Sequence, residues 1–599
     1  MKRTITFALS ILISVTGYSQ TGPGGIGSND GTSTLELWVD ANNGISGAAP
    51  ITGWSDLSGN GIINTILGNP NINIGALNGY NAITFDGSGD YISTSLDISG
   101  GSFSQLEVFA VYSLTGTSGA VWGEDNGGYD RFLVDANGAG GCNFAVSNGT
   151  GCTNSATLFP TSTPTITSIH FQEDVISGST AIVNGQTVFN FSSDHEVETS
   201  NLFDIGSIGS GSFAFNGDIA EVFVFGSFTN TAQRVIIHNY LSAKYNIALN
   251  AVDVYSEDDA INGNFDNEVA GIGRVNASNI HNDARGTGIV RILNPSGLGD
   301  NEFLMWGHDN GTQKATETTD IPAGVQARLD RVWRASEVNT SGTAVDVGAI
   351  NIRFDLAGLG TITSSDLRLL VDTDNDGVFI DETPISGATS LGSSIYQFAG
   401  VTAIANNSRF TLGTINTIQT PLPIELVSFS AKLLDKKLVK LDWQTATEVN
   451  NDYFTIERSQ NGSDWQVMSR VNGAGNSSSF LTYSIIDSKP YFGISYYRLK
   501  QTDFDGQFEY SQISSVNIER SNNSLVEIYP NPIIDQIAIV GSSSELEEVI
   551  IYNMYGKNVT VLTQLIENNG TQLIVDVTKL STGIYYIKTK TTANKMYKQ

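Results

Sequence analysis

The stretch "LEVFAVYSL", Leu106 to Leu114, predicts a strand in the middle of a β-sheet. Its apolar, β-branched and aromatic residues are typical of a strand that is covered on both faces. A second run, "IAEVFVFGSF" from Ile219 to Phe228, has the same character. Strand-like segments alternate with turns of Gly, Asn and Asp around both runs, as in "NAITFDGSGDYIST", Asn81 to Thr94. Together these runs predict a β-sandwich.

The composition extends this expectation to the whole chain. The 599 residues include 63 Gly and only 15% charged residues, which favours strands and turns over helices. This length suggests about three to five domains, so we expect an all-β, multi-domain chain of β-sandwiches. One segment, Thr231 to Ile247, has helical periodicity. Its apolar residues that fall near one face are Val235, Ile236, Tyr240, Leu241 and Tyr245.

The charge is acidic and uneven. The formal net charge is −30, and residues 20–248 carry 20 Asp plus Glu against 3 basic residues, a net of −17. Nucleic-acid binding requires a basic surface that neutralises phosphates, and a polybasic membrane patch requires clustered Lys and Arg. This part of the chain therefore favours calcium or a neutral polymer such as a glycan as its ligand, and we expect no nucleic-acid partner.

The N-terminal residues 1–19 have the pattern of a secretory signal peptide. Lys2 and Arg3 precede a short apolar run, and Gly17 and Ser19 are the small residues expected before cleavage at Gln20. The apolar run is too short to span a membrane, and no later apolar run reaches about 18 residues. We therefore expect an exported mature chain without a transmembrane segment.

The chain has two cysteines, Cys142 and Cys152, which are separated by nine residues. Exported proteins meet an oxidising environment, in which two nearby cysteines usually pair. The spacing predicts one disulfide that closes a loop, rather than a catalytic thiol.

The segment "DTDNDGVFIDE", Asp372 to Glu382, has the spacing of a calcium-binding loop. Three carboxylates at alternate positions can surround one ion, and Gly377 permits the sharp turn that follows. The twelfth position is Thr383 instead of Glu, so the last ligand stays open, and a solvated acidic turn is the alternative. The candidate ligands of this structural calcium are Asp372, Asp374, Asp376, the Val378 carbonyl, Asp381 and Glu382.

Residues 20–248 resemble the laminin-G/concanavalin-A-like jelly-roll family. The resemblance rests on the order of "WSDLSGNG", "ITFDGSGDYI" and "FNGDIAEVFVFG" followed by a helix. It implies that Trp54 and Phe85 are core residues. In relatives of this fold such acidic turns border a structural calcium, for which this chain offers Asp86, Asp90 and Asp218. The fold supports many binding proteins and some enzymes, so it does not decide the activity.

Two further segments are expected to be β-rich domains. Residues 249–418, which contain the acidic loop, are similar to an uncharacterised β-rich domain that follows the jelly roll in surface proteins of Bacteroidetes. Residues 421–520 resemble a fibronectin type III-like sandwich, in which Trp443 and "YYRLK" would take core and strand positions.

The last segment, residues 525–599, resembles the type A C-terminal sorting domain of type IX secretion. The matching positions are Tyr529, Pro530, Asn531, Pro532, Gly556 and Gly583. The resemblance implies that the type IX secretion machinery is a partner, and that the protein passes through the periplasm to the outer cell surface or the medium. It implies no chemistry on a substrate.

We therefore expect an exported, non-enzymatic adhesion or binding protein whose jelly roll binds a glycan or another surface polymer. The alternative is a divergent polysaccharide-degrading glycoside hydrolase, which would need two carboxylates beside the scissile bond. The Glu-x-Asp-x(x)-Glu run of laminarinase-like enzymes does not occur; the nearest run is "DHEVE", Asp194 to Glu198. Three aromatic residues, Trp38, Trp54 and Trp122, could stack on sugars, but burial in a sandwich core is the favoured interpretation.

Overall fold

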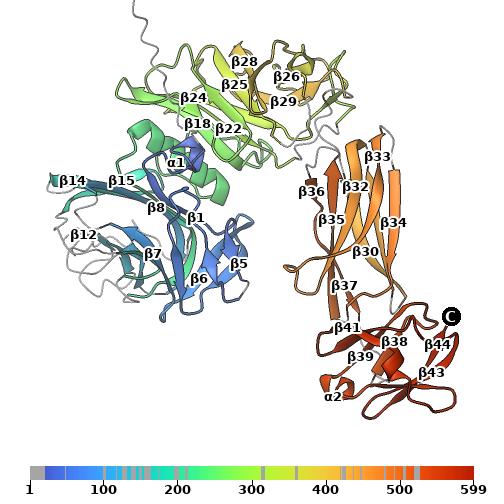
Figure 1. Ribbon diagram of the computed structural model, residues 1–599. Coiled ribbons are helices and arrows are strands. Elements are labelled where there is room, and N and C mark those ends of the chain that lie inside the picture. The colour runs from blue at the N-terminus through green and yellow to red at the C-terminus, as the bar shows by residue number, and fades with distance from the viewer. Residues whose placement is uncertain are drawn as a thin grey trace, which may run out of the picture. The chain divides into compact units, whose positions relative to one another are not determined.

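The computed structural model divides the chain into two compact units, residues 1–422 and residues 423–599 (Figure 1). The structure describes residues 21–599 except 48, 99–102, 117, 124–130, 136–143, 147–150, 154–162, 173–174, 194–201, 209–212, 312–316, 358–361, 418–419, 421–425, 436–437, 446–447, 478–480, 492, 504–507 and 519–525. The predicted signal peptide, Cys142 and the "DHEVE" run lie outside the described residues. The fold is almost entirely β, with many separate antiparallel sheets, so the predicted fold class is confirmed.

Two large sheets form a sandwich at the start of the first unit. One sheet has the order β15 (Gln186–Ser193), β14 (Val175–Val183), β13 (Thr165–Gln172), β8 (Gln105–Leu114), β17 (Asn216–Phe225), β6 (Tyr80–Asp86), β5 (Asn71–Leu77), and β1 (Leu35–Asp40) also pairs with β17. The other has the order β12 (Gly151–Thr153), β11 (Phe144–Val146), β10 (Arg131–Asp135), β9 (Ser118–Gly123), β16 (Leu202–Ile205), β7 (Tyr91–Asp97), β4 (Asn64–Leu67). A small hairpin pairs β2 (Ile45–Ser46) with β3 (Gly53–Trp54).

Strand β8 is apolar from Val108 to Tyr112 because both of its faces are covered. Val108 and Tyr112 face the core between the two sheets, whereas Phe109 and Val111 belong to a second hydrophobic cluster on the opposite face. Successive side chains of a strand point to opposite faces, so both faces of β8 are covered.

The three tryptophans of the sandwich are at most 3% exposed, which confirms the core interpretation for Trp38, Trp54 and Trp122.

The predicted helix is present as α1 (Thr231–Tyr245). It begins with a capping box in which Asn230 and Gln233 exchange hydrogen bonds between side chain and backbone. From Ile236 to Tyr245 every residue is buried, because α1 packs in one hydrophobic cluster with strands from both sides. That cluster joins Phe109 and Phe223 of the sandwich to Phe303 and Met305 of the following segment.

The second half of the first unit contains two more sheets. The first has the order β19 (Asn279–His281), β18 (Asn267–Asn276), β22 (Glu302–His308), β24 (Trp333–Asn339), β29 (Arg409–Thr414), β23 (Ala327–Arg328), and β26 (Leu367–Asp372) also pairs with β29. The second has the order β20 (Asp283–Ala284), β21 (Val290–Leu293), β25 (Ile350–Asp355), β28 (Ile395–Val401), β27 (Thr389–Gly392). A shared core that includes Trp333 and Phe354 lies between them. The domain boundary at residue 248 stays a prediction. The hydrophobic cluster around α1 contains residues from both sides of this position.

The second unit begins with another two-sheet sandwich. One sheet has the order β30 (Leu426–Asp435), β31 (Leu438–Thr445), β34 (Leu481–Asp487). The other has the order β33 (Gln466–Ser477), β32 (Glu448–Ser459), β35 (Gly493–Asp503), β36 (Phe508–Tyr510), with β37 (Ser514–Ile518) also paired to β35. Strand β31 alternates between buried and half-buried residues, and Trp443 lies fully buried in the core between the sheets.

The chain ends in a small sandwich with its own hydrophobic core. Its sheets are β38 (Val526–Tyr529), β39 (Gln536–Gly541), β42 (Gln572–Asp576), β41 (Gln564–Asn568), and β40 (Ile550–Asn553), β43 (Gly583–Lys588), β44 (Ala593–Lys598), with the short helix α2 (Ser543–Leu546). Within the described residues, the helices are all too short or too polar to cross a membrane.

Candidate metal centre

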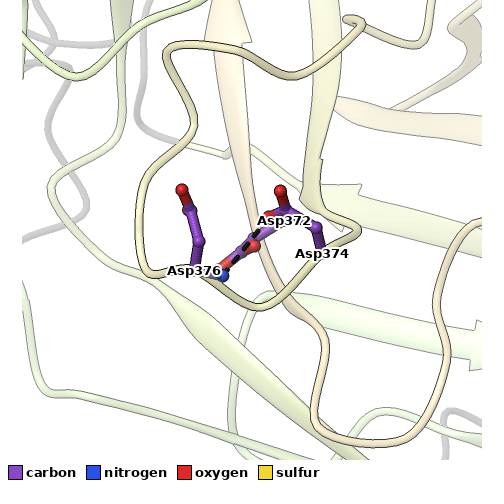
Figure 2. A group of neighbouring side chains, drawn as sticks. All are labelled: Asp372, Asp374 and Asp376. Carbon is purple, nitrogen blue, oxygen red and sulfur yellow. Dashed lines mark hydrogen bonds between the residues drawn. The ribbon is translucent and has the colours of Figure 1, made fainter.

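Three carboxylates meet in the loop that follows strand β26. Asp372 is the last residue of the strand, and Asp374 and Asp376 follow in the loop (Figure 2). One oxygen of each lies within 4.8 Å of an oxygen of the other two. The alternate spacing that predicted a calcium loop therefore brings these three side chains together.

The innermost carboxylate, Asp372, is fully buried. Its Oδ2 accepts hydrogen bonds from the Arg409 guanidinium, at 3.0 Å from Nε and 2.7 Å from Nη2, and from the Gly377 backbone N–H at 3.2 Å. Its Oδ1 is also buried and has no hydrogen-bond partner among the described residues. A buried carboxylate oxygen without a donor is costly, and a cation would offset that cost.

The loop around these residues is held by its own backbone. Asp374 accepts a hydrogen bond from the Asp376 N–H at 3.3 Å, and Asp376 accepts one from the Val378 N–H at 3.0 Å. Gly377 has φ +103°, a conformation that side chains of L-residues rarely adopt. These turns arrange the carboxylates before any ion binds, which lowers the entropy lost on binding.

The far end of the loop is anchored in the domain. Asp320 accepts hydrogen bonds from the Phe379 N–H at 2.6 Å and the Ile380 N–H at 3.1 Å. Phe379 is 1% exposed, and the Arg328 guanidinium lies 5.0 Å from its ring centroid. The loop is thus fixed at Asp372 by Arg409 and at Phe379 by Asp320.

The other predicted ligands have different surroundings. Glu382 accepts hydrogen bonds from the backbone N–H and the hydroxyl of Thr373, so it closes the loop at its base. Asp381 is exposed, and the Val378 N–H donates to Asp376, while the Val378 carbonyl stays a predicted ligand. Neither Asp381 nor Glu382 belongs to the group of three converging carboxylates.

The residues present fit calcium, which takes six to eight hard oxygen ligands. Asp372, Asp374 and Asp376 would supply carboxylate oxygens, with waters and backbone carbonyls completing the shell. Such an ion would stabilise the loop that joins β26 to the second sheet. Its role would therefore be structural.

The aspartates that were considered as calcium ligands in the N-terminal sandwich do not share one site. Asp90 accepts hydrogen bonds from the backbone N–H groups of Asn69 and Asp86, and Asp218 accepts one from the Thr84 hydroxyl. They form no converging group within the described part of the chain. Their arrangement is that of carboxylates that stabilise turns and strand ends.

A buried ion cluster beneath α1 was not expected from the sequence. The Lys244 ammonium donates to Asp40 at 2.9 Å and to Glu221 at 2.8 Å, and Glu221 also accepts from Trp38, Tyr240 and Tyr245. Burial opposes the charge of Lys244, but the two carboxylates outweigh it and hold its pKa well above the usual value. The helical spacing of Tyr240 and Lys244 was a usable signal, since it places both on one face.

Four of the predicted sorting residues, Tyr529 to Pro532, lie where the last sandwich begins. Tyr529 is buried, and its hydroxyl donates to the Pro490 carbonyl at 3.3 Å. Asn531 binds the last strand in both directions, donating to the Lys595 carbonyl and accepting from the Tyr597 N–H, each at 2.8 Å. Pro530 and Pro532 flank it, whereas Gly556 and Gly583 lie in the turn after β40 and at the start of β43.

Two segments match known protein families. Residues 527–599 match the secretion system C-terminal sorting domain, and residues 288–408 match a domain of unknown function (DUF8202). The protein is therefore exported through type IX secretion to the cell surface or beyond, and the predicted localisation is confirmed. No curated protein matches the chain.

Several solved structures share limited similarity with the chain. Domain 4 of AbnA, a GH43 extracellular arabinanase from Geobacillus stearothermophilus in complex with arabinotriose, is 18% identical; the match covers 32% of this chain and 91% of that one, with a TM-score of 0.23. The binding domain of botulinum neurotoxin DC in complex with SialylT is 9% identical, with coverage of 64% and 95% and a TM-score of 0.27. At these TM-scores neither likeness indicates a shared function.

Proposed function

We propose that this exported protein is a non-enzymatic binding or adhesion protein. Its N-terminal sandwich would bind a glycan or another surface polymer, and the following domain would be stabilised by calcium. The sorting domain carries the proposal, because it directs the chain to the outside of the cell, where polymers of this kind are the accessible surfaces. The membership of the N-terminal sandwich in the laminin-G/concanavalin-A-like family remains a prediction.

The charge of residues 20–248 supports a neutral ligand for the N-terminal sandwich. Its net charge of −17 opposes the approach of polyanions and favours calcium or uncharged sugars. Calcium in the following domain is supported by the buried Asp372 oxygen and by the two carboxylates beside it.

A glycan array and a reducing-sugar assay on the same preparation of residues 20–599 would test the proposal. We expect binding to one or more neutral glycans and no release of reducing ends from those that bind. Release of reducing sugar would support the glycoside hydrolase instead. Binding to no glycan, with the chain folded and calcium present, would contradict the role of the N-terminal sandwich.

A further inference from the structure

One face of the second unit carries cations and aromatic rings in alternation. The face belongs to the sheet β33–β32–β35–β36, in which Glu457 lies opposite Arg498, and Lys500 lies opposite both Thr455 and Tyr510. Residues that are directly opposite in antiparallel strands point to the same side of a sheet. The side chains of this cation–aromatic face are Tyr453, Glu457, Trp465, Arg470, Arg498, Lys500, Phe508 and Tyr510.

Arg498 is held between two rings. Its guanidinium lies 4.2 Å from the ring centroid of Trp465 and 3.9 Å from that of Tyr510, and its Nε donates to Glu457 at 2.7 Å. A guanidinium in such a position keeps one orientation, and it is more weakly hydrated than an ammonium. Arg498 is therefore held in one orientation, and the N–H groups that do not bind Glu457 can still bind an anion.

Two further cations on this face have rings but no acidic partner. The Lys500 ammonium lies 3.6 Å from the ring centroid of Phe508, and the Arg470 guanidinium lies 4.7 Å from that of Tyr453. Neither has an ion pair with any residue that the structure describes, although the whole chain holds 61 acidic and 31 basic residues. The face therefore has a local surplus of positive charge, although the formal net charge of the whole chain is −30.

The rings at the edge of the face are open to solvent. Phe508 is 54% exposed and Tyr510 is 40% exposed, and both lie on the three-residue edge strand β36. Exposed rings beside cations are a feature of binding surfaces, where they contribute contact area at low cost in side-chain entropy.

We propose that the cation–aromatic face binds an acidic polysaccharide through its carboxylate or sulfate groups. Three cations held by rings match an extended polymer with repeated anionic groups, and they lose little freedom on binding. Single-stranded nucleic acid is less suited, because bases stack on ring faces and a cation already lies over one face of each of Trp465, Phe508 and Tyr510. This surface is separate from the N-terminal sandwich, so either binding role can fail without the other.

Affinity electrophoresis of the full chain, residues 20–599, would test this inference. The gels would contain alginate or polygalacturonate as carboxylated polymers, dextran sulfate as a sulfated one, and dextran as a neutral control. We expect retardation by at least one anionic polymer, weaker at high salt, and none by dextran. No retardation by any anionic polymer would overturn the inference.

Paired variants locate the site. The double variant Arg470→Gln/Lys500→Gln should weaken binding about tenfold, since two charged contacts are lost. The variant Phe508→Ala/Tyr510→Ala should weaken it as well. The matched control is Lys588→Gln/Lys595→Gln in the last sandwich, where Lys595 lies 4.7 Å from the ring centroid of Tyr597. This control should bind as the unmodified chain does.

The same variants separate the competing explanations. Unchanged melting temperatures would show that a loss of binding is not a loss of folding. Equal binding by all variants would overturn the inference, as would tighter binding of single-stranded DNA than of any polysaccharide. Self-association that the variants abolish, measured by light scattering, would instead assign the face to a second copy of the chain.

Discussion

Arg409 neutralises one oxygen of Asp372 and leaves the other oxygen buried without a hydrogen-bond partner in the described structure. The three carboxylates of the loop carry three negative charges, and the guanidinium offsets one of them. The remaining charge of −2 balances the charge of +2 on a calcium ion. The arginine thus sets the charge of the site as well as the position of its innermost ligand.

The first prediction concerns this loop. Replacing the exposed Asp374 with Ala should abolish the rise in melting temperature that calcium gives to the unmodified chain. A ligand at a hundred times its dissociation constant stabilises the folded state by about 2.7 kcal/mol, which calorimetry with calcium and with EGTA can resolve.

The control for this experiment is Asp300→Ala, which removes an exposed carboxylate paired with Arg274 in the same unit. It should leave the effect of calcium unchanged. If calcium stabilises the Asp374→Ala variant as it does the unmodified protein, the loop is an acidic turn without an ion. Asp381→Ala would decide whether Asp381 is a ligand.

The second prediction concerns the ion cluster beneath α1. Lys244→Met should lower the free energy of unfolding by about 3–5 kcal/mol at pH 7, because Asp40 and Glu221 would remain buried without their cation. Burial already raises the pKa of Glu221, so protonation should reduce the loss at pH 5. Urea unfolding measures both values.

An exposed ion pair provides the comparison for Lys244. Arg274→Ala removes the pair with Asp300, in which the two side chains are 32% and 56% exposed. We expect a loss of about 0–1 kcal/mol, as exposed pairs contribute little. If the free energy of unfolding fell by a similar amount in both variants, the ion pairs of Lys244 would contribute no more to stability than the pair of Arg274 and Asp300.

The sequence predicted the local features of the fold better than the contacts between distant strands. Strand β31 and helix α1 follow from periodicity, and the three converging aspartates follow from their spacing within one loop. The sequence did not predict that α1 is buried on all sides, because polar residues such as Lys244 and His238 suggest a side that faces solvent, whereas both are buried. The cation–aromatic face depends on the register of four strands, which no local pattern reveals.

The third prediction concerns the pH dependence of the first unit. Burial and the nearby Asp253 raise the pKa of Asp258 to about 7, so the folded state binds this proton more tightly than the unfolded state. Stability should therefore fall as pH rises from about 4 to beyond 7. Asp258→Asn should remove part of this slope and increase stability at pH 8 on the order of 1–3 kcal/mol.

Denaturant unfolding at pH 5 and pH 8, with a chelator present, measures this effect. Burial also raises the pKa of Glu337 to about 7, so a slope of the same sign should persist in the Asp258→Asn variant. A variant that is less stable than the unmodified protein at pH 8 would show that the Asp258 carboxylate is ionised and well solvated.

The fourth prediction concerns the two cysteines. Cys142 and Cys152 should be joined in the secreted protein, because they are the only pair in an oxidising environment. Mass spectrometry of alkylated peptides without reduction should show one cross-linked species. Two alkylated thiols in secreted material would contradict the pairing.

The last prediction concerns export. Residues 526–599 form a sandwich with its own core, and contacts to the preceding sandwich include Tyr529 with Pro490 and Lys489 with Gln536. Because the two cores are separate, deletion of this segment should leave the upstream domains folded but trapped in the periplasm. Cell fractionation, with protease resistance as the measure of folding, would show both results.

A fusion experiment completes the argument about export. Residues 525–599, placed after a signal peptide and an unrelated passenger, should bring that passenger to the surface or medium of a cell with type IX machinery. Asn531→Ala in this fusion should reduce export, because Asn531 joins the start of the sandwich to strand β44. Asn569→Ala, a change in an exposed turn of the same sandwich, is the control. Export of the truncated protein would show that the segment is dispensable for secretion.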